Sequence, residues 1–104
     1  MDNNRLDTLK QFLETRPNDC FVRYGIAQEL VKAEQYEEAI AEFDRILDID
    51  ADYQAAYYHS GKTYEKMGRP DDARATYQKG IEASHRTGDQ HARSELEAAL
   101  SELG

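Results

Sequence analysis

The sequence predicts an all-α fold in which helix pairs stack side by side as a solenoid. Apolar residues recur at spacings of three and four along almost the whole chain, which is typical of amphipathic helices. The two prolines, Pro17 and Pro70, both fall at boundaries between these apolar runs. The chain also resembles itself at a shift of 34 residues, and such a period is typical of helical-repeat proteins.

Six segments carry the helical spacing, and none shows the period of two that a strand would need. Their apolar residues are, in chain order, Leu6, Leu9, Phe12 and Leu13; Ile26, Ala27, Leu30 and Val31; Tyr36, Ala39, Ile40, Phe43, Ile46 and Leu47; Tyr57, Gly61, Tyr64 and Met67; Ala73, Tyr77, Gly80 and Ile81; and Ala92, Leu96, Ala99, Leu100 and Leu103. We therefore expect one domain over residues 1–104. It comprises an opening helix (2–16), two helix pairs (20–53 and 54–87) and a closing helix (88–103).

Polar residues agree with these boundaries. Asp19 can cap the second helix, and Asp52 is placed to cap the fourth. Glu37-Glu38 and Asp71-Asp72 lie in first turns, where the helix dipole favours negative charge.

The shift that relates the two halves of the chain superposes residues of like size. It places Ala27 on Gly61, Leu30 on Tyr64, Ala39 on Ala73, Phe43 on Tyr77 and Leu47 on Ile81. Where two helices cross closely only Ala or Gly fits, and a bulky side chain must fill the space between such crossings. The small positions therefore predict where the helices of a pair meet.

This pattern resembles the tetratricopeptide repeat family, whose repeat unit is a helix pair of the same length as this period. The family's motif has large residues at positions 4, 7, 11 and 24 and small residues at 8, 20 and 27, with proline at 32. At positions 4, 7, 8, 11, 20, 24, 27 and 32 repeat one holds Arg23, Ile26, Ala27, Leu30, Ala39, Phe43, Ile46 and Ala51. At the same positions repeat two holds Tyr57, Ser60, Gly61, Tyr64, Ala73, Tyr77, Gly80 and His85. Pro17 matches position 32 of a preceding half-repeat, with Leu9 at 24 and Phe12 at 27. The resemblance covers residues 2 to about 87 and implies two full repeats flanked by an N-terminal half-repeat helix and a C-terminal capping helix.

Some positions depart from the motif. Arg23 stands where a bulky apolar residue is usual, and Ser60 and Gly80 leave the second repeat short of aliphatic volume. We expect Tyr57, Tyr64 and Tyr77 to fill that space.

The composition argues against several classes of partner. The chain holds 21 Asp and Glu against 13 Lys and Arg. It therefore lacks the basic excess needed by a nucleic-acid surface or by a site for anionic lipid. The first five residues are not the apolar run of a signal peptide, and no stretch approaches the ~20 apolar residues of a membrane span. We expect a cytoplasmic protein whose single cysteine, Cys20, is a small buried thiol.

Two clusters of metal-ligand residue types occur, and neither has the spacing of a metal site. Asp48, Asp50 and Asp52 resemble the start of a calcium loop, but its sixth and twelfth positions hold Tyr53 and His59 instead of Gly and Glu. His85, Asp89 and His91 flank a helix break, so a surface cluster is the better interpretation. His59 and Ser60 are adjacent and point apart on a helix, so they cannot form a nucleophile–base pair. We predict no metal, no cofactor and no enzymatic activity.

The family resemblance implies a concave groove lined by positions 2, 5, 9, 12 and 13 of each repeat. On this chain they are Phe21, Tyr24, Gln28, Val31 and Lys32, then Ala55, Tyr58, Lys62, Glu65 and Lys66. Positions 2, 5, 9 and 12 are spaced by three or four, so they form one stripe on a helix, apart from the packing stripe.

Charge suggests one kind of ligand for this groove. Three of the five lysines, Lys32, Lys62 and Lys66, map to it, and Arg93 is expected to join them. Together with aromatic residues they favour an acidic peptide or a free C-terminal carboxylate. The alternative is that lysine is common on any exposed helix face. Some members of the family grip a C-terminal carboxylate through a Lys-Asn-Asn-Lys-Arg set. Here those positions hold Tyr24, Gln28, His59, Asp89 and Arg93, so a clamp of that kind is not expected.

The sequence thus predicts a non-enzymatic adaptor or scaffold, monomeric or weakly dimeric, that binds a peptide or helix of another protein in its groove. The alternative is a structural self-association module that forms a homodimer through its end helices. Its apolar surface would include Leu6, Leu13, Leu96 and Leu103.

Overall fold

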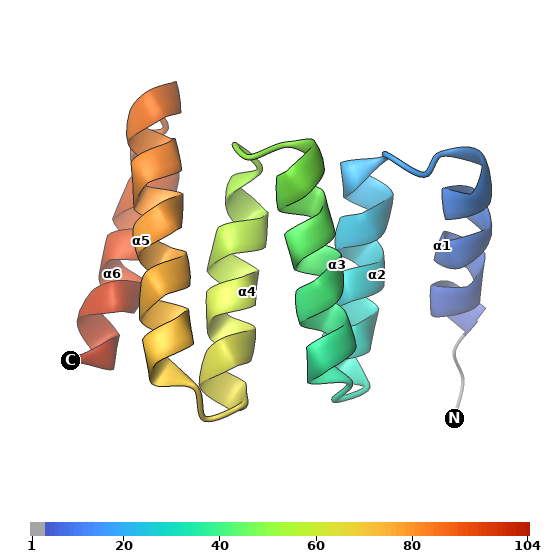
Figure 1. Ribbon diagram of the computed structural model, residues 1–104, viewed down its shortest axis with the longest axis horizontal. Helices are drawn as coiled ribbons and strands as arrows, with labels where there is room; N and C mark the ends of the chain where they lie inside the picture. Colours follow the sequence, from blue (N-terminus) through green and yellow to red (C-terminus); the bar gives the residue numbers. More distant parts are fainter. Residues whose placement is uncertain (1–3) are drawn as a thin grey trace. The chain divides into compact units, whose positions relative to one another are not determined.

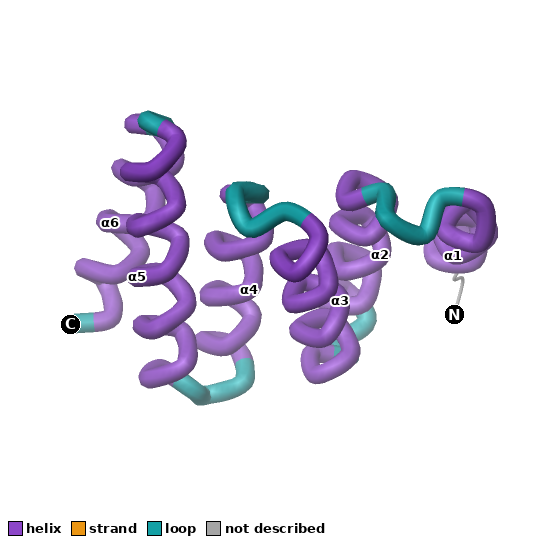
Figure 2. Tube along the Cα trace, turned by 45° about the horizontal axis from the view of Figure 1, so that its top comes forward, coloured by secondary structure: helices purple, strands orange, loops and turns teal. Residues whose placement is uncertain are grey.

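The computed structural model describes residues 4–104, and within that range the chain is almost entirely helical (Figure 1). No strand occurs among these residues (Figure 2), so the predicted all-α fold is confirmed. The described helices are α1 (Asn4–Thr15), α2 (Cys20–Lys32), α3 (Tyr36–Ile49), α4 (Gln54–Lys66), α5 (Pro70–Thr87) and α6 (Gln90–Leu103). Residues 2 and 3 of the predicted opening helix lie outside the described residues. The chain divides into two compact units, Met1–Asp50 and Ala51–Gly104.

In the first unit, α2 packs against both α1 and α3. Its core gathers the apolar positions that the helical spacing predicted, and Ala27, Ala39, Phe43 and Ile46 are completely inaccessible to solvent. Burial of Ala39 confirms that a small residue stands where two helices approach closely.

In the second unit, α5 packs against both α4 and α6. Glycine makes these approaches possible, because a Cβ atom on Gly61 would lie 2.2 Å from the Tyr77 ring, and one on Gly80 would lie 2.7 Å from Tyr57. Ala73 and Tyr77 are completely buried. The Tyr57 and Tyr77 rings thus fill volume that repeat two lacks in aliphatic residues, as predicted, whereas Tyr64 is only half-buried.

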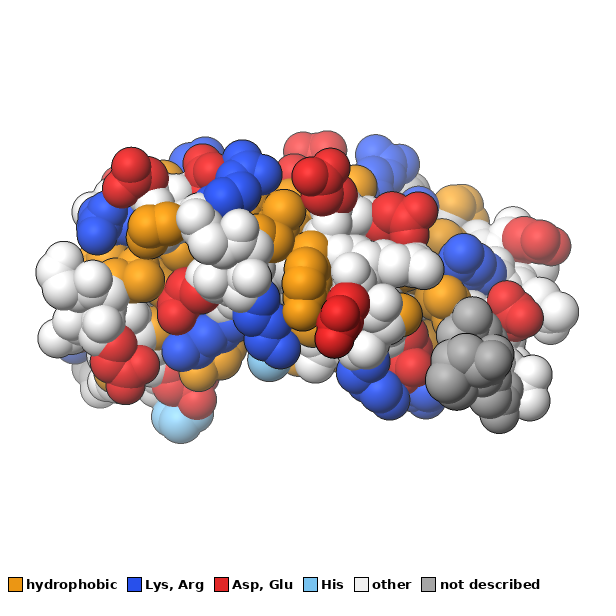
Figure 3. Space-filling model, turned by 90° about the horizontal axis from the view of Figure 1, so that it is seen from below, with side chains coloured by type: hydrophobic (Ala, Val, Ile, Leu, Met, Phe, Trp, Pro, Cys, Tyr) orange, Lys and Arg blue, Asp and Glu red, His pale blue; other side chains and the backbone are white. Residues whose placement is uncertain are grey.

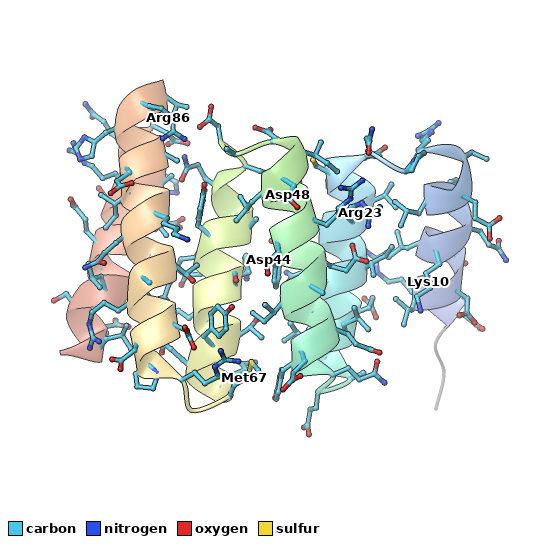
Figure 4. All side chains as sticks on the ribbon, in the orientation of Figure 1. Lys10, Arg23, Asp44, Asp48, Met67 and Arg86 are labelled. Atoms are coloured by element: carbon cyan, nitrogen blue, oxygen red, sulfur yellow. The ribbon has the colours of Figure 1, made fainter. Side chains whose placement is uncertain are left out.

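The helix caps agree with the sequence at one of the two predicted positions. Asp19 accepts a hydrogen bond from the Val22 amide at 3.2 Å and so caps α2. The prediction for Asp52 is wrong: the residue before α4 is Tyr53, which makes no side-chain cap, and Asp52 pairs with Arg86 at 2.7 Å near the end of α5 (Figure 4). The prediction for Cys20 needs correction too, because the thiol is half-buried at the first position of α2.

The turns inside the two helix pairs recur at the repeat period. The Gln35 amide donates to the Leu30 carbonyl at 2.9 Å, and the Arg69 amide donates to the Tyr64 carbonyl at the same distance. Each turn contains a residue in the left-handed region, Glu34 (φ 61°) or Gly68 (φ 72°). Glycine suits that conformation, whereas Glu34 adopts it at a steric cost.

Position 4 of each repeat also makes the same contact in both units. Arg23 donates through Nε to the Pro17 carbonyl at 2.9 Å and pairs through Nη1 with Glu42, also at 2.9 Å (Figure 4). Tyr57 donates its hydroxyl to the Ala51 carbonyl at 2.6 Å. Pro17 and Ala51 are one repeat period apart, as are Arg23 and Tyr57. Arg23 therefore replaces an apolar residue without leaving its charge unpaired.

Gly61→Ala is expected to lower the free energy of unfolding by about 2–3 kcal/mol, because the new methyl group would overlap the buried Tyr77 ring. Urea unfolding followed by circular dichroism measures the change. Gly25→Ala is the matched control: its methyl group would meet the flexible ends of Leu9, at 3.1 Å, and of Arg5, at 3.8 Å, and alanine gains helix propensity. Equal losses for the two variants would contradict this account.

Tyr57→Phe is expected to cost about 1 kcal/mol, since it removes a buried hydroxyl's hydrogen bond and leaves the Ala51 carbonyl without that donor. Tyr36→Phe, at a half-buried tyrosine, serves as the control in the same unfolding experiment. A Tyr57→Phe protein as stable as the parent would show that the recurring contact at position 4 is dispensable.

Candidate functional site

The predicted binding stripe of the first unit lies on α2. Phe21 is exposed over 75% of its surface, the largest exposed fraction of any bulky apolar residue described. Tyr24, Gln28 and Val31 are half-buried and Lys32 is exposed. Gln28 donates its side-chain amide to the Tyr24 hydroxyl at 3.3 Å, and burial raises the pKa of Tyr24. The stripe therefore presents an apolar ring beside a neutral polar pair.

A hollow of about 240 Å³ opens beside this stripe, between α1 and α2. Its lining comprises Arg5, Leu9, Phe21, Tyr24, Gly25 and Gln28. Because Gly25 has no side chain, the floor of the hollow is formed by backbone and by the Leu9 methyl groups. This α1–α2 hollow brings together three predicted residues with three that the groove prediction did not contain.

The charges around the α1–α2 hollow form a small cluster. One carboxylate oxygen of Glu29 accepts a hydrogen bond from Arg5 Nε at 2.9 Å. The same oxygen lies 3.4 Å from Lys32 Nζ. Two cations thus share one anion, and the cluster keeps an excess positive charge. Arg5 is 66% exposed and Lys32 71% exposed, so both can still meet a ligand.

The predicted stripe of the second unit lies on α4 and carries its lysine differently. Lys62 Nζ lies 5.6 Å from the centre of the Tyr58 ring, within range of a cation–π contact. The same ammonium lies 4.0 Å from Glu65 and 3.8 Å from Glu102. Glu65 also accepts the Tyr77 hydroxyl at 2.5 Å, and burial together with this carboxylate raises the pKa of Tyr77. The charge of Lys62 is therefore largely compensated within its own unit.

The other predicted cation of α4 stands apart from these pairs. Lys66 is exposed in the last turn of the helix, where a positive charge complements the helix dipole. On the face drawn in Figure 3, Lys and Arg side chains lie next to Asp and Glu side chains instead of forming a patch of their own.

A second hollow, of about 210 Å³, lies between α4 and α6. Its lining comprises Gln54, Ala55, Tyr58, His59, Asp89, His91, Ala92, Glu95 and Leu96. Burial lowers the pKa of His59, although the Glu95 carboxylate acts in the opposite direction. His91 pairs with Glu95 at 3.5 Å, and both side chains are exposed at the edge of the hollow. This α4–α6 hollow is more polar and more acidic than the α1–α2 hollow.

Arg93 does not join Tyr58 in the α4–α6 hollow. It is half-buried and lines a smaller hollow of about 140 Å³ at the turn between α5 and α6, together with Ser84, His85 and Gly88. Its Nε is buried and has no hydrogen-bond partner among the described residues. The expectation that Arg93 adds to a common positive surface therefore finds no support in the second unit.

Neither suspected cluster of metal-ligand residues forms a metal site within residues 4–104. No group of three or more His, Cys, Asp or Glu side chains in that range is arranged to hold an ion. Asp52 is engaged by Arg86, and His91 by Glu95. In the same range no helix is both long and apolar enough to cross a membrane.

Sequence reasoning missed the contribution of α1 to the hollow. The signal was available in the repeat period, which places Arg5 on Ala39 and Leu9 on Phe43. An arginine at a position that holds a small residue in both full repeats indicates an unusual surface. The groove prediction did not include it, because it considered only the first helix of each repeat. The contribution of α6 to this surface was also missed. Its residues Glu95 and Glu102 reach α4, but the register of α6 departs from the motif.

Known proteins agree with this architecture. The family model for the tetratricopeptide repeat matches residues 30–100. The solution structure of a tetratricopeptide repeat domain protein from Salinibacter ruber is 42% identical, with a TM-score of 0.78, over 84% of this chain and 88% of that one. A crystal structure of a tetratricopeptide repeat domain protein from the same organism is also 42% identical, with a TM-score of 0.74, over 82% of this chain and 94% of that one.

A third structure is that of protein BPP2914 from Bordetella parapertussis, which is 26% identical with a TM-score of 0.83. It covers 99% of this chain and 89% of its own. The search of curated proteins finds no match. The family model, the identity with the Salinibacter ruber domain and the turns and position-4 contacts that recur at the repeat period lead to one conclusion: this chain belongs to the tetratricopeptide repeat family.

Proposed function

We propose that this chain is an adaptor or scaffold module that binds a peptide or helix of another protein through the exposed stripes of α2 and α4. Tetratricopeptide repeats are generally a non-enzymatic, protein-interaction fold. The observation that carries the proposal for this chain is the Phe21 side chain. It is 75% exposed at the rim of a preformed hollow, and a large apolar side chain in such a place is typical of a protein-binding surface.

The composition of the two stripes also supports this proposal. Both stripes combine aromatic rings with cations, a composition enriched at the energetic centres of protein interfaces. The residues proposed to contact the ligand are Phe21, Tyr24, Gln28, Val31 and Lys32 on α2 and Tyr58, Lys62, Glu65 and Lys66 on α4. Arg93 is proposed only as a peripheral contact, since it lines a separate hollow.

The alternative of self-association through the end helices has less support. Two of its four leucines, Leu6 and Leu96, are buried at 8% and 1% exposure and are not available to a second copy. Leu13 and Leu103 are half-buried. A scattering experiment over a dilution series would detect the tight dimer that this alternative requires.

Peptides selected from a displayed random library with this chain as bait are expected to bind about tenfold more weakly to Phe21→Ala, because an exposed aromatic contact residue is lost. Phe12→Ala is the matched control, since Phe12 is the other exposed phenylalanine, at 50%. Isothermal titration measures both affinities, and a thermal melt verifies that each variant folds. If the library yields no binder, or if every binder is indifferent to Phe21 and Tyr58 substitution, the proposed surface is wrong.

The ligand is further proposed to be acidic, and Lys66 provides the sharper test because the charge of Lys62 is compensated. Lys66→Glu is expected to weaken an acidic library peptide about threefold to tenfold at low salt, with a smaller effect at high salt. Lys79→Glu, at an exposed position of α5, changes the net charge equally and should have little effect. Equal weakening by both variants would mean that net charge, not the α4 stripe, attracts the peptide.

A further inference from the structure

One face of α1 has no described helix packed against it. The repeat period relates α1 to α3 and α5, and it places Leu9 on Phe43 and Tyr77. Phe43 and Tyr77 are completely buried, because α3 packs on α2 and α5 packs on α4. Leu9 is only half-buried, and it lines the α1–α2 hollow. The hollow on α1 therefore corresponds to the space that the first helix of the pair, α2 or α4, occupies in the full repeats.

Another repeat helix is a poor occupant for this place. The residue of α1 that corresponds to the small Ala39 and Ala73 is Arg5. Both alanines are completely buried at helix crossings, whereas the Arg5 side chain is 66% exposed and held by Glu29. A helix that approached α1 as closely as α4 approaches α5 would overlap the guanidinium group. This observation also disfavours a second copy of the chain docking its own helix there.

The second unit shows what kind of side chain suits such a place. Tyr58 of α4 lies with its ring centre 6.4 Å from that of Tyr77, the residue that corresponds to Leu9. Tyr58 also lines a hollow with Ala92 and Leu96 of α6, the helix that packs on α5 as α2 packs on α1. By this correspondence, an aromatic ring of a partner protein would fit against α1 and α2 as the Tyr58 ring fits against α5 and α6.

The size and charge of the α1–α2 hollow narrow the choice further. Its volume of about 240 Å³ is below the roughly 300–1,000 Å³ of small-molecule sites, which suits one side chain better than a whole ligand. Arg5 stands at its rim, and the cluster of Arg5, Lys32 and Glu29 has one positive charge in excess. A carboxylate next to the bound ring would compensate that charge.

We propose that the α1–α2 hollow is a specificity pocket that takes one aromatic side chain of a partner protein, with a carboxylate beside that side chain bound by Arg5. Phe21 and Tyr24 flank the ring, Leu9 and the backbone at Gly25 form the floor, and Arg5 faces the carboxylate. The inference rests on the proposed protein-binding function and names the class of segment that the first unit selects.

The probe is N-acetyl-L-phenylalanine, which carries an aromatic ring and a carboxylate, and its amide provides the uncharged comparison. Titration into the isotopically labelled full chain, followed by nuclear magnetic resonance, should shift the Gly25 amide and the Leu9 methyl signals. The free acid is expected to bind about threefold more tightly than the amide. Phe12, Gln11 and Thr15 line a different hollow on α1, so their signals should not move in parallel.

Two exposed variants separate the two halves of the proposal without risk to the core. Phe21→Ala should weaken both probes about fivefold, because it removes an aromatic wall. Arg5→Gln should weaken only the acid, to the level of the amide, whereas Lys10→Gln on the same helix, also exposed, should change neither probe (Figure 4).

Three results would overturn the pocket: no shift at Gly25 and Leu9 at millimolar probe, shifts of equal size around Phe12, or equal binding of acid and amide to the parent protein. Failure here is distinguishable from failure of the proposed function. Library peptides that depend on Tyr58 and Lys66 but not on Phe21 or Arg5 would leave protein binding intact and remove only the pocket. A complete lack of library binders would remove the proposed function itself.

Discussion

The close approach of paired helices is the constraint on which each unit depends. A Cβ atom on Gly61 would lie 2.2 Å from the Tyr77 ring, and the corresponding crossing in the first unit is closed by alanines that have no exposed surface. Close packing of this kind leaves no room for adjustment, so the identity of a few small residues determines which helix faces meet. The opposite faces are then free to carry other chemistry, and the aromatic stripes of α2 and α4 occupy them.

Much of the fold was predictable because it follows from periodicities that local sequence records directly. The helical spacing located every described helix to within a few residues, and the repeat period identified the small positions. Position 4 was harder to interpret, because Arg23 breaks the apolar pattern. The reason became clear only in three dimensions: Arg23 and Tyr57 both donate to the carbonyl that lies six residues earlier, so both repeats use a long side chain with a donor at its tip.

The candidate site was less predictable, since it depends on contacts that sequence spacing does not contain. Lys62 was expected to be an open cation, yet carboxylates of its own helix and of α6 lie 4.0 and 3.8 Å away. Glu102 is distant from Lys62 in the sequence and sits on a helix whose register departs from the repeat motif. Asp52 shows the same limitation, because its partner Arg86 lies a full repeat period further along the chain, while Tyr53 stands at the cap position of α4.

These ion pairs leave different charges exposed in the two units. An acidic chain has more carboxylates than cations, so most lysines and arginines find a partner within reach, and a surface cation contributes little to affinity once it is paired. In the second unit the Tyr58 and Tyr77 rings lie close together, and the charge of Lys62 is compensated by nearby carboxylates. In the first unit Arg5 and Lys32 share the single carboxylate of Glu29 beside an apolar hollow. Positive charge in excess of its carboxylate partner therefore lies beside an apolar hollow in the first unit, whereas on α4 the exposed cation is Lys66 in the last turn.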